Sequence, residues 1–302
     1  MKKQNQDTLY LDCTTIPKVL MLGNGINRAY NFASWDDLIK SIQTKVLTAD
    51  ETASLEQIPY PMRPVILTDD HLGTQMQEIS GELSALKAPC AEENLLRQYA
   101  DLPVDTIITA NYSYELEKTL KEDFSCLPGR RCKYRKVAYS ESGKYNIQQL
   151  HTYYVPKENL PIWHVHGEAA RPDTMILGHY YYGKLLAKMQ QYVSTLIARY
   201  KTCIAKQQPM EIHSWLDYFM LGDVYIVGLG MALSELDLWW LINCKKRHFP
   251  DRKTYLYKPD IHIEEKLLAE AYGVIVDSNG YNGDYPTYYQ YLYEHLMEIM
   301  TS

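Results

Sequence analysis

The chain lacks several features that define whole classes of protein. None of its six cysteines forms a C-x-x-C pair, so the sequence predicts neither a zinc ribbon nor a disulfide framework. No apolar run approaches the ~18 residues that a membrane-spanning helix needs, and the opening segment, MKKQNQDTLYLDC, holds no apolar stretch of signal-peptide length. We therefore expect a cytoplasmic protein with reduced thiols and without a membrane partner.

An excess of basic residues is also missing. The 31 lysines and arginines are outnumbered by 37 aspartates and glutamates, which gives a formal net charge of −6. Such a chain has no overall basic field to hold a phosphate backbone, so we expect no direct binding to nucleic acid. What is present is the composition of an ordinary globular protein, with 46% hydrophobic and 23% charged residues over 302 positions.

Short apolar segments alternate with helical patterns along the chain. Strand patterns occupy residues 18–22, 105–112, 161–167, 174–178, 223–230, 253–259 and 273–277. Helical patterns occupy residues 75–87, 91–100, 183–220 with a break near Gln207-Gln208-Pro209, 263–271 and the segment after Pro286. This alternation is typical of an α/β fold, a Rossmann-like parallel sheet of about six strands with helices on both faces. We expect one domain over residues 1–302, with mainly helical insertions near 45–100 and 183–220.

Two of the helix starts carry a capping-box pattern. Ser34 is followed three residues later by Asp37, and Ser234 is followed by Asp237. In such a box the two side chains hydrogen-bond to backbone amides in the first turn. We therefore expect Asp237 to cap the apolar helix that begins with LDLWWLINC.

The first strand pattern ends in Gly23-Asn24-Gly25. Glycine removes the Cβ at such a turn, and the amides that follow can face an anion at a helix start. Arg28 stands at the third glycine position of the dehydrogenase fingerprint, and no acidic residue ends a strand about 20 residues on, so we do not expect hydride transfer. For this motif alone, a tight turn that binds no ligand is an equal alternative.

Polar residues end the next two strand patterns. Asn111 ends the second, and His166-Gly167 ends the third. A histidine can act as a general base because its pKa lies near neutrality. Since ligands bind at the carboxyl ends of parallel strands, we expect Asn111 and His166 to face one cleft lined by residues 23–27 and 228–230. By the two-residue period of a strand, His164 should share the face of His166, where a structural role is the commoner one.

Four short segments together resemble the motifs of the sirtuin (silent information regulator) family. They are Gly23-Asn24-Gly25-Ile26-Asn27, Thr109-Ala110-Asn111, His166-Gly167 and Gly228-Leu229-Gly230, in the family's order. The matching family segments read G-A-G-I-S, T-x-N-x-D, H-G and G-[TS]-S. The chain departs from the deacylases in two ways, because Ser113 replaces the aspartate and the four-cysteine zinc ribbon is missing. Cys126 and Cys132 are unpartnered, and the chain is more similar to zinc-less bacterial sirtuin-like domains.

This resemblance implies an NAD hydrolase that cleaves the nicotinamide–ribose bond, to give nicotinamide and ADP-ribose or its cyclic form, in bacterial defence against phage. NAD would be the substrate, and neither zinc nor another metal is expected. Asn111 would orient the ribose hydroxyls or a water, and His166 would take a proton. The resemblance implies that the other motif residues contact NAD, namely Gly23, Asn24, Gly25, Asn27, Thr109, Gly167, Gly228 and Gly230.

Two alternatives remain open at this point. The same pocket would allow a sensor that binds NAD or ADP-ribose without turnover. His164-x-His166 also resembles the two-histidine start of a metal-dependent hydrolase site, although Asp277 is the only acidic residue that ends a strand pattern. Because an unregulated NAD hydrolase would harm its own cell, we expect control by a homo-oligomer, a separate activating protein or the helical insertions.

Overall fold

The computed structural model describes residues 9–30, 35–41, 43, 45–68, 90–117, 119, 151–155, 158–167 and 174–301. Three sequence predictions lie outside these ranges, namely the helix at 75–87, the capping residue Ser34 and the cysteines at 126 and 132. Among the described residues, no helix is both long and apolar enough to cross a membrane.

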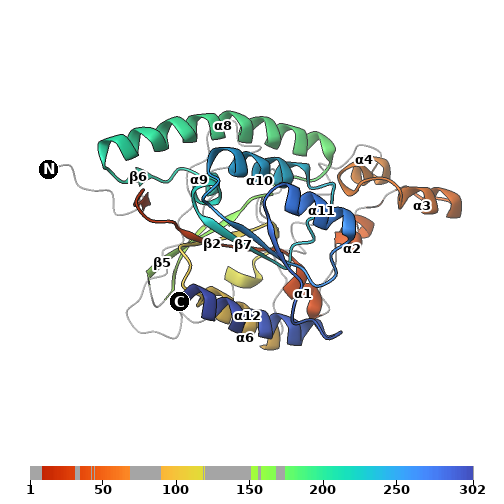
Figure 1. The fold of residues 1–302 in the computed structure, drawn as a ribbon. Helices are drawn as coiled ribbons and strands as arrows, with labels where there is room; N and C mark the ends of the chain where they lie inside the picture. Colours follow the sequence, from red (N-terminus) through yellow and green to blue (C-terminus); the bar gives the residue numbers. More distant parts are fainter. Residues whose placement is uncertain are drawn as a thin grey trace.

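A seven-stranded sheet lies between two layers of helices (Figure 1). Its strands stand in the spatial order β4-β5-β3-β2-β7-β8-β9. All pairs are parallel except β4 with β5 at one edge, so six strands form a parallel sheet. The bounds are β2 Lys18–Leu22, β3 Thr106–Thr109, β4 His151–Val155, β5 Glu158–His164, β7 Asp223–Val227, β8 Thr254–Tyr257 and β9 Ile275–Asp277. The predicted Rossmann-like α/β fold is confirmed.

The order of the six parallel strands identifies the place where a ligand binds in such folds. Counted along the chain, they stand in the order 3-2-1-4-5-6, which is that of dinucleotide-binding sheets. The order reverses between β2 and β7. The last residue of β2, Leu22, is in register with Thr109 on one side and with Val227 on the other. The carboxyl ends of neighbouring strands are therefore level, and the loops that follow them start at one edge.

Helices cover both faces of this sheet (Figure 1). On one face lie α8 His179–Lys206, α9 Trp215–Leu221, α10 Leu236–His248 and α11 Ile263–Ala271, and on the other lie α1 Gly25–Ala29, α6 Cys90–Ala100 and α12 Tyr285–Thr301. Shorter helices follow α1, namely α2 Trp35–Ser41, α3 Ala49–Leu55, η1 Tyr60–Met62 and α4 Arg63–Leu67. A small antiparallel pair joins β1 Tyr10–Leu11 to β6 Met210–Glu211. The predicted break is confirmed, because α8 ends where Gln207 adopts a left-handed φ of 51°.

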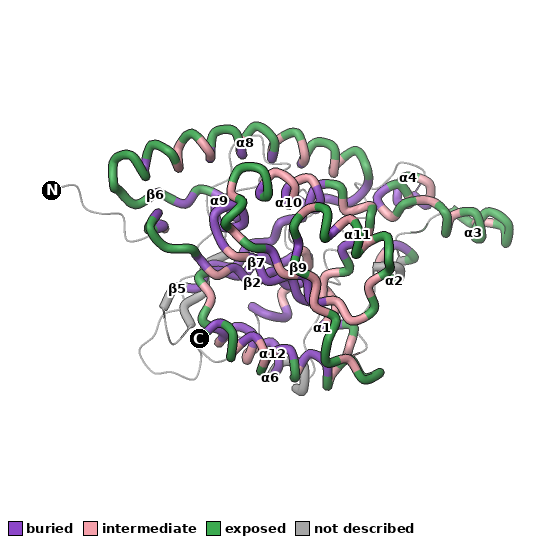
Figure 2. The backbone as a smooth tube through the Cα atoms, in the orientation of Figure 1, coloured by how far each residue is buried: buried purple, intermediate pink, exposed green. Residues whose placement is uncertain are grey.

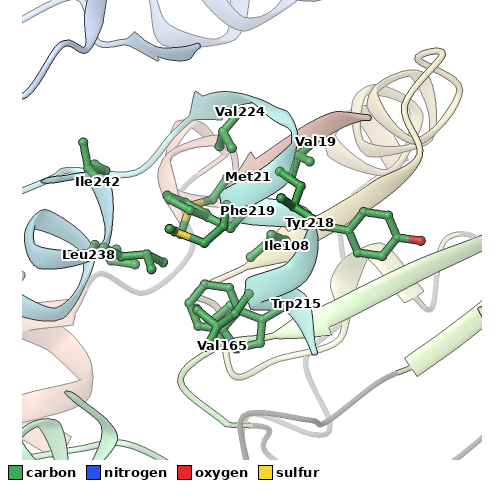
Figure 3. Packing of buried hydrophobic residues seen from close by; sticks show 14 of the residues in the cluster. Val19, Met21, Ile108, Val165, Trp215, Tyr218, Phe219, Val224, Leu238 and Ile242 are labelled. Atoms are coloured by element: carbon green, nitrogen blue, oxygen red, sulfur yellow. The ribbon is translucent and has the colours of Figure 1, made fainter. Parts of the chain in front are cut away.

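The core explains why the strands read as continuous apolar runs. Val19 and Met21 point into the cluster under α8, α9 and α10, whereas Leu20 and Leu22 point toward α6 and α12. Figure 3 shows Val19 and Met21 among the aromatic and aliphatic side chains of the first cluster. Both faces of each central strand are therefore buried, as the purple tube of the sheet shows in Figure 2.

The prediction of a strand at residues 174–178 is wrong. It forms no ladder within the described residues, and its Ile176 amide donates one hydrogen bond to the His166 carbonyl, 2.7 Å away. Met175 and Leu177 are buried in a small separate cluster with Tyr112. The segment is apolar because it is buried, and burial alone does not distinguish a strand from an irregular chain. Strand β4, in a polar stretch, was not predicted.

Candidate functional site

The loops after β2 and β7 pack directly against each other at the carboxyl edge. The Gly23 amide donates to the Val227 carbonyl at 2.9 Å, and the Gly25 amide donates to the Gly228 carbonyl at 2.7 Å. A Cβ on Gly23 would lie 2.5 Å from the Gly228 oxygen, and one on Gly25 would lie 2.6 Å from the Gly228 Cα. Gly228 itself has a φ of +67°, which favours glycine. The close contact between the two loops therefore requires glycine at positions 23 and 25, and the backbone angle favours it at position 228.

We expect Gly23→Ala to destabilise the fold by ~1–3 kcal/mol or more, because the atoms that its Cβ would meet belong to backbone and cannot rotate away. Gly230→Ala is the matched control, since a Cβ at that position meets nothing within 4 Å. The control should stay within about 0.5 kcal/mol of the unsubstituted chain. Urea unfolding of the purified variants measures both effects. Equal stability of the two variants would contradict this packing argument.

A small pocket opens beside these loops, on the α6 and α12 side of the sheet. It gathers residues from the ends of β2 and β3 and from the segments that follow them, namely Leu22, Gly23, Ile26, Asn27, Leu96, Thr109, Asn111, Ser113, Glu115, Leu116 and Glu117. The Asn111 side-chain amide lies 3.5 Å from the Gly23 carbonyl, and its backbone amide donates to Thr109 Oγ1 at 3.1 Å. Four of the predicted site residues, Gly23, Asn27, Thr109 and Asn111, are thus brought together.

Two carboxylates in this pocket were missed by the sequence analysis. The hydroxyl of Ser113 donates to Glu115 Oε2 at 2.7 Å, and both side chains are buried. Residues 115–117 are helical, so Glu115 and Glu117 stand in the first turn after β3, where they face the carboxyl edge. None of the described residues that line the pocket is basic. The arrangement suits a hydroxyl-rich or cationic group better than a phosphate.

His164 is held by two partners at the end of β5. Its Nδ1 is 2.7 Å from the Asn111 carbonyl, and its Nε2 makes a short contact with Glu117 Oε1. Both side chains of the His164–Glu117 pair are almost fully buried. Since a carbonyl only accepts, Nδ1 donates its hydrogen to the Asn111 carbonyl, and Nε2 is engaged by the Glu117 carboxyl group. Neither nitrogen is left for a metal or a substrate.

His166 lies two residues beyond and contacts a different element. Its Nε2 is 2.9 Å from Asp237 Oδ2, in the first turn of α10, and the Tyr182 ring stands edge-on with centroids 5.3 Å apart. The expectation that His164 and His166 share a face is therefore wrong. The two-residue alternation stops because β5 ends at His164. His166 does not line the pocket at Asn111, although both residues stand two positions beyond the register pair of Thr109 with His164.

The start of α10 places two carboxylates next to His166. The predicted capping box of Ser234 and Asp237 does not form. The helix begins after Glu235 without a side-chain cap, and Asp237 contacts His166 instead. Burial raises the pKa of Glu235 to about 6, against the opposing effect of His166 and with a contribution from Asp237. Burial on its own would lower the pKa of His166, but Asp237 and Glu235 raise it above its usual value.

These three residues also have the composition of a cation site. One ligand atom from each of His166, Glu235 and Asp237 lies within 4.8 Å of the other two. Among the described residues, Glu235 Oε2 and Asp237 Oδ1 are buried without a hydrogen-bond partner. One imidazole and two carboxylates are ligands that several divalent metals accept.

The remaining predicted residues surround this edge without lining the pocket. Asn24 is half-buried in the turn between Gly23 and Gly25. Gly167 has a φ of +93°, and a Cβ there would lie 2.2 Å from the Thr174 carbonyl oxygen, so the close approach of segment 174–177 requires it. Gly230 is exposed, and its carbonyl accepts a hydrogen bond from Lys258 Nζ at 2.7 Å.

No protein-family model matches the chain, and no curated protein matches its sequence. The fold and the residues at its carboxyl edge therefore carry the functional argument.

Proposed function

We propose that the protein is a sirtuin-like NAD hydrolase that acts in bacterial defence against phage. The reaction is NAD⁺ with water to give nicotinamide, ADP-ribose and a proton. One observation carries the proposal: the six parallel strands have the dinucleotide-binding order, and Asn111 and His166 follow neighbouring strands at its carboxyl edge. A homo-oligomer or a separate activating protein would control the activity.

The pocket supports a position for the nicotinamide ribose. Asn111, Ser113 and Glu115 offer amide, hydroxyl and carboxylate groups to ribose hydroxyls. The nicotinamide ring of NAD⁺ is cationic, and positive charge moves to the ribose as the bond breaks. Preorganised negative charge stabilises such a developing cation, because it needs no reorganisation during the reaction. The Glu115 side chain thus favours cleavage as well as binding.

The glycine loop has a narrower role than its sequence predicts. The amides of Gly23 and Gly25 are already donated to the strand end and loop of β7. In the proposed complex these two amides therefore do not bind the pyrophosphate, which lies outside the acidic pocket, near the exposed Arg28.

Incubation of the purified chain with NAD tests the proposal. We expect nicotinamide and ADP-ribose in equal amounts, measured by chromatography, at a rate that EDTA does not change. Extracts of phage-infected cells are added in a second arm to supply an activating partner. If NAD binds and stays intact in both arms, the sensor alternative replaces the hydrolase.

A metal-dependent hydrolase is the second candidate function. The cluster of His166, Glu235 and Asp237 favours it, whereas His164 does not take part because both of its nitrogens are engaged. This candidate predicts that EDTA abolishes turnover and that a divalent metal restores it. The chelator arm of the same assay therefore separates the two functions.

A further inference from the structure

Two buried carboxylate oxygens at the start of α10 have no hydrogen-bond partner in the described part of the chain. They are Glu235 Oε2 and Asp237 Oδ1, and both are out of contact with solvent. Asp237 is only 2% exposed, and its other oxygen lies 2.9 Å from His166 Nε2. A buried acceptor without a donor is costly, so two of them side by side indicate a bound water or ion.

The charge around these oxygens favours an ion over a water. Within the ranges that the structure describes, Glu235 and Asp237 form no ion pair with a lysine or an arginine, and their charged contact is with His166. The dipole of α10 favours negative charge in its first turn, but it supplies no ligand for the two free oxygens. Buried charges in proteins are paired or bound to metals. The missing partner of the two carboxylates is therefore a cation.

We propose that His166, Glu235 and Asp237 bind one divalent metal ion of the zinc class. One ligand atom from each residue lies within 4.8 Å of the other two. Ligand atoms stand about 2.0–2.2 Å from a zinc ion, so a small inward movement of one side chain completes the set. Glu235 can make this movement, because it is the least buried of the three residues.

The three ligands also select the class of metal. Imidazole suits zinc and its neighbours in the first transition row, whereas Mg²⁺ and Ca²⁺ prefer oxygen ligands alone. A double positive charge balances two carboxylates, and the imidazole then binds as a neutral ligand. Three protein ligands leave a fourth tetrahedral position to water or another small molecule. We therefore expect zinc to bind more tightly than magnesium.

Aromatic rings enclose the cluster and separate it from bulk water. The Tyr182 ring, from α8, stands edge-on to the His166 imidazole with centroids 5.3 Å apart. Tyr112 also lies close enough to interact with both carboxylates, and its hydroxyl donates to the Ile176 carbonyl at 2.8 Å. Attraction between a cation and carboxylates is stronger in such a place than in water. A metal there would join the segment after β5 to the start of α10 and stabilise the fold.

The proposed metal site is separate from the pocket at Asn111, because none of its three residues lines that pocket. Metal binding can therefore be tested without NAD. One consequence does rest on the proposed function, since a ring nitrogen that binds zinc is withheld from the role proposed for His166. Added zinc should then slow nicotinamide release by the metal-free protein, whereas a metal-dependent hydrolase would be faster with the metal.

Calorimetric titration of the full chain with zinc chloride, after removal of metal by a chelator and dialysis, tests the proposal. We expect one zinc ion at this site and an affinity for magnesium chloride at least ~100-fold weaker. Asp237→Asn and Glu235→Gln keep the shape of the side chain and should each weaken zinc binding ~100-fold or more, because even the loss of a group behind a ligand costs 10- to 100-fold. Zinc should also raise the melting temperature of the unsubstituted chain and leave that of both variants nearly unchanged at the same concentration.

Asp277→Asn is the matched control. Asp277 Oδ2 lies 3.7 Å from His295 Nε2, which makes a second histidine–carboxylate pair without a third ligand residue among the described ones. This variant should bind zinc as the unsubstituted chain does. X-ray absorption at the zinc edge gives a second measurement that needs no variant. It should show nitrogen and oxygen ligands without sulfur, although the chain has six cysteines.

Absence of zinc binding overturns the proposal and leaves water as the occupant. Zinc that both folded cluster variants retain, or that has sulfur ligands, is adventitious and overturns it too. Equal affinity for zinc and magnesium overturns the class of metal. If zinc binds as expected but the metal-free protein releases no nicotinamide, with or without extracts of infected cells, the proposed function fails and the metal site stands.

Discussion

His166→Ala should lower the rate of nicotinamide release ~100- to 10,000-fold and leave NAD binding largely intact. A positioned general base contributes a factor of that size, and it acts in the transition state more than in the ground state. The loss should therefore fall on kcat, with the dissociation constant for NAD changed little. Stopped assays of nicotinamide release and calorimetric titration with NAD measure the two quantities.

His248→Ala is the matched control for this substitution, because His248 is exposed at the opposite end of α10 from Asp237. It should keep the unsubstituted rate. Removal of His166 leaves Asp237 buried without its partner, so thermal melting must show that the variant is folded under assay conditions. A folded His166→Ala variant that hydrolyses NAD at the unsubstituted rate would remove His166 from the mechanism and favour the sensor.

The sheet could be predicted from the sequence because its signal is local. Residues 18–22 and 223–227 are apolar on both faces and are followed by glycines, a pattern that few other structures produce. Segment 174–178 has a similar apolar composition, yet it pairs with no strand among the described residues, so its pattern predicted the wrong structure. Strand pairing depends on neighbours that are distant in sequence, and a local window does not contain them.

The site was predictable only in part, for the same reason. The carboxyl-edge rule predicted the neighbourhood of Asn111 and Gly23, since it needs only the strand ends. The partner of Asp237 was not predictable, because the local signal at Ser234 indicated a cap. Glu115 and Glu117 were missed, although one signal was present: they stand in the first turn of the helix that follows the short segment after β3. Acidic residues in that position face the edge where ligands bind.

His164 and His166 show how two similar histidines diverge once tertiary contacts are known. Each is buried, and each contacts a carboxylate. His164 uses both nitrogens within the fold, whereas His166 has a hydrogen-bond partner among the described residues at Nε2 alone, and a role in turnover is proposed for it. The first should therefore affect stability and the second turnover.

His164→Leu should destabilise the protein by ~3–5 kcal/mol, because it leaves the buried Glu117 carboxylate and the Asn111 carbonyl without their partner. The double variant His164→Leu/Glu117→Leu should lose less stability than the sum of the two single variants, since it leaves no buried charge. We expect a coupling energy of ~0.5–3 kcal/mol in this cycle, measured by urea unfolding. Additive losses would show that the His164–Glu117 contact contributes no coupling energy. The structural role of His164 would then lose its support, and a functional role would have to be considered.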